Sequence, residues 1–142
     1  MHRENPDCVV ATETELKLDD IPRIPGYATM VPSTTNSILV RAVMFVRKEL
    51  EPQQILTPSD TQMVACKVGN TAIVGLYRQL SLVTKAGTIR GTDIEAQQYE
   101  CIDGAIRAVS TDYKSLHVCG DINLDPTRGG SKHYYKKPLL MK

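Results

Sequence analysis

A carboxylate and a carboxamide stand two residues apart in the second half of the chain, at Asp121 and Asn123. The apolar run Leu116–Cys119 before them predicts a β-strand, which Gly120 is expected to end. Side chains at i and i+2 beyond a strand can lie on one side of the exit loop. A carboxylate and a carboxamide placed together suit a phosphate ester and an attacking water, because they bind metal, accept protons and donate hydrogen bonds. The same spacing is also ordinary turn chemistry.

Two earlier strand ends carry further polar groups. The nearly continuous apolar run Asp7–Glu13 predicts a strand buried on both faces. The carboxylate of Glu13 at its end needs a partner such as a cation if it is buried, or stays solvated if the strand end faces the surface. The run Thr71–Tyr77 ends in a phenol followed by Arg78. A hydroxyl and a guanidinium can hold a phosphate together, although a strand-end aromatic beside a surface charge is the commoner meaning.

Several other segments predict the strands that must position these groups. Ile38–Val46 is rich in β-branched residues and predicts a core strand, which Arg41 interrupts at an edge or outward position. Thr61–Val68 and Thr71–Tyr77 predict two strands joined at Gly69 and Asn70, both of which tolerate positive φ in a two-residue hairpin. Leu16–Met30, with its prolines and paired aspartates, is typical of a loop.

One long amphipathic helix precedes the Asp121 region. Apolar residues recur at helical spacing over Asp93–Val109, and this stripe predicts a helix that packs on the sheet. Thr92 and Glu95 fit a capping box, with Thr92 as N-cap and Glu95 at N3. The helix therefore leads the chain back to the strand before Asp121.

Length and composition are those of one globular domain with its own core, covering residues 1–142. The net charge of +1 gives no general attraction to nucleic acid or to a membrane surface. Between Asp125 and Lys142, however, there are five basic residues and one acidic residue. This excess could favour phosphates, or it could form a solvated basic helix face.

The four cysteines are scattered and include no C-x-x-C pair, so the sequence suggests no zinc site. Three of them stand in apolar runs, as buried free thiols do. Nothing resembles a signal peptide, and no apolar run approaches the length that spans a membrane. These features favour a reducing, intracellular compartment and no membrane partner.

In chain order, the segments around Glu13, around Tyr77 and from Asp121 to Asn123, with a long helix before the third, resemble the endonuclease/exonuclease/phosphatase superfamily. Other segments are similar to the endonuclease domains of non-LTR retrotransposons, and the resemblance covers nearly the whole chain from about Asp7. These segments are Val9–Lys17, Ile24–Tyr27, Val46–Leu50 and Val74–Gln79.

The resemblance implies an α/β fold in which two mixed, mostly antiparallel sheets form a sandwich with a flanking helix. It also implies phosphodiester hydrolysis that depends on Mg²⁺ or Mn²⁺. Glu13 matches the metal-binding glutamate of the family, and Tyr77 matches its phosphate-contacting tyrosine. Asp121 matches the catalytic aspartate that orients or deprotonates water, and Asn123 matches the asparagine that binds the scissile phosphate. Arg78 has no fixed role in the family and is a candidate phosphate contact.

Three features of the family are missing. Only Met1–Pro6 precede the Glu13 strand, which leaves no room for the family's first strand and its asparagine. No Ser-Asp-His segment follows Asn123, and the family's Arg-Gly-Gly is replaced near Arg41 and Ala42. Loss of such groups removes positioning and charge stabilisation. We therefore expect a truncated domain, the central part of such an enzyme, with weak or absent cleavage by this chain alone.

The expected function is that of a retrotransposon-derived, metal-dependent DNA endonuclease domain. The resemblance implies DNA as the substrate, a possible reverse transcriptase domain in the parent polypeptide, and a nuclear location. The superfamily also contains phosphoinositide and sphingolipid phosphodiesterases, but the context from Thr12 to Tyr27 favours the retroelement type. The alternative is a non-catalytic remnant that packs or binds nucleic acid through its basic C-terminal segment.

Overall fold

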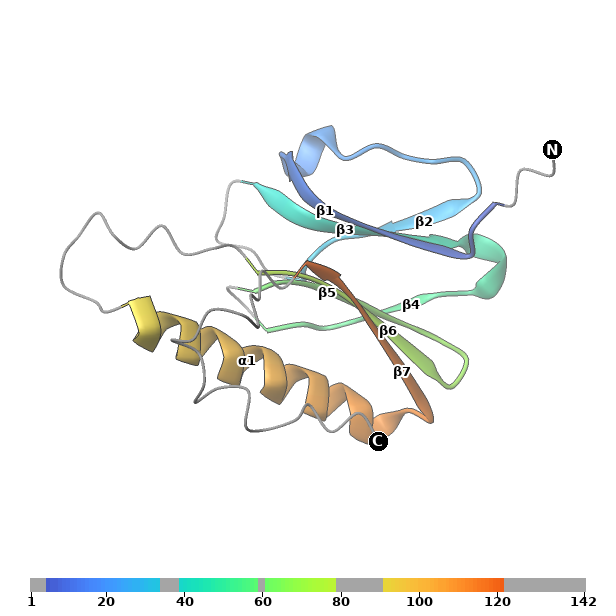
Figure 1. Cartoon of the computed structure of the whole chain (residues 1–142). Helices are drawn as coiled ribbons and strands as arrows, with labels where there is room; N and C mark the ends of the chain where they lie inside the picture. The colour runs from blue at the N-terminus through green and yellow to red at the C-terminus, as the bar shows by residue number, and fades with distance from the viewer. Residues whose placement is uncertain (1–4, 34–38, 59–60, 79–90, 122–142) are drawn as a thin grey trace.

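Two β-sheets face each other, and a helix covers the outer side of one of them (Figure 1). The structure is a computed structural model that describes residues 5–33, 39–58, 61–78 and 91–121. Within these residues, one sheet has the strand order β1-β3-β2 (sheet A) and the other the order β4-β5-β6-β7 (sheet B). The elements are β1 (Cys8–Leu16), η1 (Leu18–Asp20), β2 (Tyr27–Met30), β3 (Val40–Arg47), η2 (Lys48–Leu50), β4 (Gln53–Ile55), β5 (Gln62–Val68), β6 (Thr71–Tyr77), α1 (Gly91–Asp112) and β7 (Ser115–Asp121).

Sheet A is built around β3, which is antiparallel to both of its neighbours. All residues from Ala42 to Val46 are buried, as the apolar run predicted. The prediction that the Asp7–Glu13 run is buried on both faces is wrong. In the described part of the chain β1 lies at the edge of sheet A, and its residues are only half-buried or exposed. An apolar run at a sheet edge has no neighbouring strand to cover one side of it.

Sheet B contains the expected hairpin. β5 and β6 pair from Gln62↔Tyr77 to Val68↔Thr71, and Gly69 in the turn between them has a φ of +58°. That backbone conformation is open to glycine without strain, so the hairpin prediction is confirmed. β7 joins on the other side of β6 in parallel, after the chain has crossed over through α1.

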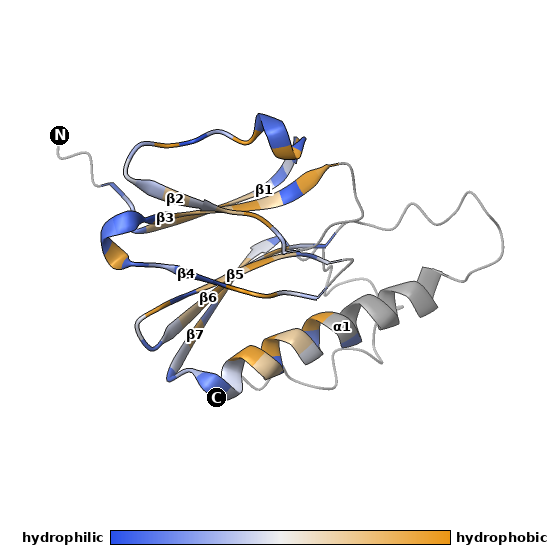
Figure 2. Cartoon of the chain, turned by 180° about the vertical axis from the view of Figure 1, so that it is seen from behind, coloured by the Kyte–Doolittle hydropathy of each residue, from blue (hydrophilic) through white to orange (hydrophobic). Residues whose placement is uncertain are grey.

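Three apolar clusters are buried among the described residues. The first lies between the sheets, and the second lies between sheet B and the helix, where Ala105 and Val109 pack on the strands. The third consists of Val40, Val43 and Phe45 of β3. Figure 2 shows apolar residues along the strands and along α1. The buried residues of the first cluster are Met30, Ala42, Met44, Val46, Val64, Cys66 and Tyr77. The buried strand residues of the second cluster are Met63, Ala65, Ala72, Val74 and Leu76.

The helix prediction is confirmed, with a change at its start. α1 begins at Gly91, so Thr92 lies inside the helix and not at the N-cap. Two short strands, β2 and β4, fall in segments whose sequence is typical of loops. Each pairs with a core strand, β2 with β3 and β4 with β5, and this pairing outweighs weak local preference.

None of the helices in the described ranges is long and apolar enough to cross a membrane.

The described cysteines differ in exposure. Cys66 is buried, Cys8 is half-buried and Cys119 is exposed, so the expectation of buried thiols fails for Cys119. Cys119 belongs to β7, which lies at the edge of sheet B among the described strands. Burial, with a smaller contribution from Cys8, raises the pKa of the Cys66 thiol to about 11.

This raised pKa predicts a loss of stability at high pH. The unfolded thiol releases its proton near pH 9.0, whereas the folded thiol keeps it until about pH 11. The folded state therefore binds more protons in this window, and the free energy of unfolding falls as pH rises through it, by about 2–3 kcal/mol from this group. Urea unfolding of the wild type and of Cys66→Ala at pH 8 and pH 10.5 measures the difference. Equal pH dependence in the two proteins would contradict the expectation.

Candidate functional site

Tyr77 and Asp121 are brought side by side by the parallel pairing of β6 with β7. They are register partners at the ends of these strands, and the backbone N–H of Arg78 donates to the carbonyl oxygen of Asp121 at 2.9 Å. Tyr77 is 8% exposed and Asp121 is half-buried. The ends of β6 and β7, which carry two separate groups of candidate residues in the sequence, are therefore adjacent in the structure.

Gly120 allows this close approach. It was expected to end the strand, but β7 continues through it to Asp121. Its φ of +135° is a conformation that residues with a side chain rarely adopt. A Cβ atom at this position would lie 1.9 Å from the carbonyl oxygen of Leu76 in β6. The glycine is therefore what lets β7 lie against β6 as far as Asp121, which makes Asp121 a strand residue and not an exit-loop residue.

Glu13 lies on the edge strand of sheet A, where β1 departs from regular pairing. The register is Thr12↔Ala42 and then Leu16↔Val40, so an irregularity falls between these pairs. Glu13 has a φ of +56°, and its neighbour Glu15 has a φ of +47°. Residues other than glycine hold such a conformation only when the surrounding structure imposes it, and these positions gather at functional sites. The positive φ angles of Glu13 and Glu15 therefore support a special role for this part of β1.

The carboxylate of Glu13 is exposed. Of the two alternatives drawn from the sequence, the structure therefore shows the solvated carboxylate, but Glu13 lies within β1, which continues to Leu16, and not at the strand end. Within the residues that the structure describes, the Glu13 side chain makes no hydrogen bond or ion pair. An open carboxylate on a constrained backbone is available to a cation.

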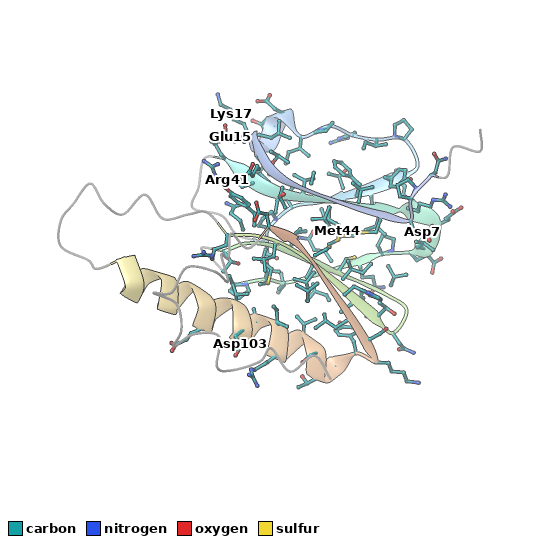
Figure 3. All side chains as sticks on the ribbon, viewed as in Figure 1. Asp7, Glu15, Lys17, Arg41, Met44 and Asp103 are labelled. Atoms are coloured by element: carbon teal, nitrogen blue, oxygen red, sulfur yellow. The ribbon has the colours of Figure 1, made fainter. Side chains whose placement is uncertain are left out.

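A second acidic residue beside Glu13 is paired. Arg41 of β3 forms an ion pair with Glu15, with 3.0 Å between Nη1 and Oε1, and the two side chains stand together in Figure 3. The side chain of Arg41 is only 18% exposed, against 66% for Glu15. In the sequence, Arg41 is marked only as the residue that interrupts an apolar run, and no local pattern places it near Glu13.

Arg78 is 4% exposed. The alternative prediction, that Arg78 is only a surface charge after a strand, is therefore wrong. Its backbone is fixed by the hydrogen bond to Asp121. A guanidinium that is withdrawn from water interacts more strongly with an anion than one on the surface, which is compatible with the predicted phosphate contact.

Glu13 and the Tyr77–Asp121 pair belong to different sheets, and a hydrogen bond of Gln62 joins the strands beside them. The carboxamide of Gln62, the register partner of Tyr77, accepts a hydrogen bond from the backbone N–H of Arg41 at 2.9 Å. Arg41 in turn lies between Val40 and Ala42, which pair with β1 on either side of Glu13. Asn123 and the basic segment from Asp125 to Lys142 lie outside the described residues.

Glu13 and Asp121 carry the carboxylates of the candidate site. Carboxylate oxygens are ligands that Mg²⁺ prefers, usually together with water and substrate phosphate. Among the residues of the described ranges, no group of three His, Cys, Asp or Glu side chains is close enough to hold a metal ion.

The fold is similar to that of a solved DNA-processing protein. The 3′ phosphatase NExo from Neisseria, in a structure with a product DNA hairpin, matches with a TM-score of 0.62 over 89% of this chain, at 16% sequence identity. The match covers 51% of the NExo chain, so this chain spans about half its length. The likeness confirms the expected fold class, a two-sheet α/β fold of the endonuclease/exonuclease/phosphatase type.

No protein-family model matches the sequence, and no curated protein matches it.

Proposed function

We propose that this chain is a divalent-metal-dependent phosphodiesterase domain that acts on DNA, of the kind found in retrotransposon endonucleases. The observation that carries the proposal is the pairing of Tyr77 with Asp121 at the end of the sandwich where Glu13 stands on a constrained backbone. The fold likeness to a 3′ phosphatase bound to DNA supports hydrolysis of a DNA phosphoester. The resemblance of the sequence supports the retroelement type, a reverse transcriptase domain in the parent polypeptide and a nuclear location.

The proposed chemistry divides among the named side chains. Glu13 and Asp121 would hold Mg²⁺ or Mn²⁺, which when bound polarises the phosphoryl oxygens and stabilises the leaving oxygen. Asp121 would also orient the attacking water and accept its proton. The Tyr77 hydroxyl would donate a hydrogen bond to the phosphate, because its ring is buried while its register places it beside Asp121. Arg78 and Asn123 would add contacts to the same phosphate.

We further propose that hydrolysis by this chain alone is slow. Residues 124–142 include no Ser-Asp-His segment, and in the family that the sequence resembles such a segment supplies an acid and an imidazole to the site. Loss of one positioned donor or base lowers a rate by about 10²-fold or more. A non-catalytic, DNA-binding remnant is the competing function.

Nicking of supercoiled plasmid in Mg²⁺ tests the proposal. We expect slow nicking that EDTA abolishes and that Asp121→Asn lowers by about 100-fold, because the amide can neither accept the proton nor hold the cation as a carboxylate does. Asp103→Asn is the matched control, since Asp103 lies on α1 and pairs only with Arg107 at 2.7 Å on the surface (Figure 3). A DNA hairpin with a 3′ phosphate tests phosphate release in parallel.

Two results would contradict the proposal of catalysis. One is nicking that persists equally in Asp121→Asn and Asp103→Asn. The other is the absence of both nicking and phosphate release in a wild-type chain whose fold is demonstrated by cooperative unfolding. In the second case DNA binding without hydrolysis would favour the competing function.

A further inference from the structure

The side chain of Gln62 crosses from one sheet to the other. From β5 in sheet B, its Oε1 accepts a hydrogen bond from the backbone N–H of Arg41 at 2.9 Å. Its Nε2 donates to the carbonyl oxygen of Leu39 at 3.3 Å. One carboxamide thus engages a donor and an acceptor in residues 39–41, at the start of β3 in sheet A.

Residues 39–41 lie beyond the part of β3 that pairs with β2. This pairing runs from Tyr27↔Arg47 to Met30↔Met44. In a strand, the N–H of one residue and the C=O two residues before it point to the same side. A glutamine side chain carries the donor and the acceptor of a peptide group, so it can bond to this side of a strand as a neighbouring strand does.

On its sheet A side, the stretch held by Gln62 is the one that supports Glu13. Val40 and Ala42 pair with Leu16 and Thr12, the residues on either side of the irregular part of β1. The hydroxyl of Thr14 donates to the carbonyl oxygen of Val40 at 2.6 Å. The constrained backbone of Glu13 is therefore fixed against the same stretch that receives the Gln62 carboxamide.

On its sheet B side, the backbone of Gln62 is placed by the other half of the site. Gln62 pairs with Tyr77, and Tyr77 pairs with Asp121. Gln62 therefore pairs with Tyr77 through its backbone. Its side chain contacts the part of β3 that packs beside Glu13. No motif in the sequence marks Gln62.

We propose that Gln62 is a positioning residue that sets where the Glu13 carboxylate stands relative to Asp121 and Tyr77. The inference rests on the proposed function, because it assigns Gln62 a part in the same metal and phosphate site. Residues that orient the ligands of a metal affect its affinity by about 10- to 100-fold when they are replaced. Gln62 would act in this way through the backbone of β3.

A second glutamine provides a matched control. Gln54 of β4 also reaches from sheet B to the sheet A side, where its Nε2 donates to the carbonyl oxygen of Val31 at 2.7 Å. Its register partner is Cys66, in the middle of β5, away from Tyr77 and Asp121. Gln54→Met therefore removes a hydrogen bond between the sheets without touching the site, whereas Gln62→Met removes those that join the two halves of the site.

Titration of the full chain with Mn²⁺, followed by electron paramagnetic resonance without DNA, tests the inference. We expect Gln62→Met to raise the Kd for Mn²⁺ by about 10-fold or more, and Gln54→Met to leave it within about twofold. A merely structural role would lower Tm but leave the Kd of the folded fraction unchanged. If Gln62→Met does not fold, Gln62→Asn replaces it, since it keeps the carboxamide but lacks the reach by one methylene.

The same titration separates the two ways in which the inference can fail. Asp121→Asn and Glu13→Gln should each weaken Mn²⁺ binding to the chain. If the wild type binds no Mn²⁺, or if both of these variants bind it as well as the wild type, the proposed function fails and the inference falls with it. If binding depends on Asp121 and Glu13 but Gln62→Met behaves like Gln54→Met, only the role of Gln62 is overturned.

Discussion

Replacing Gly120 with alanine is expected to destabilise the protein by about 3–5 kcal/mol, a range reached by few single substitutions. Two effects add at this position. A φ of +135° strains any residue with a Cβ, and that Cβ would stand 1.9 Å from the Leu76 carbonyl oxygen, with two further Leu76 backbone atoms within 2.9 Å. Because these atoms are backbone and not the end of a flexible side chain, β7 itself must move away from β6.

Chemical unfolding of Gly120→Ala against Gly104→Ala measures this effect. Gly104 lies within α1, and a Cβ there would meet nothing within 4 Å. Alanine at that position should be neutral or stabilising by up to about 1 kcal/mol, because it is the better helix former. The idea fails if Gly120→Ala unfolds at the wild-type denaturant concentration. Mn²⁺ binding should fall in Gly120→Ala as well, since the shift of β7 carries Asp121 with it.

Truncating Met44 to alanine is expected to lower the free energy of unfolding by about 2–5 kcal/mol. Met44 is fully buried in the middle of β3 and belongs to the apolar layer between the two sheets (Figure 3). Removal of its side chain leaves a cavity against neighbours on both sheets, which are held by their own backbone pairing and cannot close in completely.

Leu56→Ala is the control for Met44→Ala. Leu56 is 86% exposed, so its truncation removes little buried surface and should change stability by less than about 0.5 kcal/mol. Urea titrations of both variants, with intact m-values, give the comparison. Similar midpoints for Met44→Ala and Leu56→Ala would show that the layer between the sheets is not the main core.

Elements with a strong local pattern were predictable from the sequence. β3 follows from its β-branched run, the β5–β6 hairpin from Gly69 and Asn70, and α1 from its helical spacing. β2 and β4 were not predictable, because they are short and lack an apolar alternation. Their extended form depends on the hydrogen bonds that they make to β3 and β5.

The sequence named candidate site residues, but it did not show how the fold positions them. The resemblance assigns Glu13, Tyr77 and Asp121 to one site. No local sequence pattern, however, shows that Tyr77 and Asp121 are paired in neighbouring strands. A glycine after an apolar run is typical of a strand end. That Gly120 instead allows β7 to continue beside β6 depends on the position of the Leu76 backbone, which the sequence does not show. Gln62 was missed because its partner Arg41 is 21 residues away, and no local pattern marks a polar group with a distant partner.

The crossover between β6 and β7 has a consequence for the order in which the chain folds. The β5–β6 hairpin closes over two residues, and hairpins form in about 1–10 μs. β7 reaches its place only when segments such as Thr71 and Ser115, 44 residues apart, come together, which requires a much longer loop to close. We therefore expect Tyr77 to be in place early and Asp121 to arrive late. A chain that stops before that last step would already contain most of its inter-sheet core, but Asp121 would not yet lie beside Tyr77.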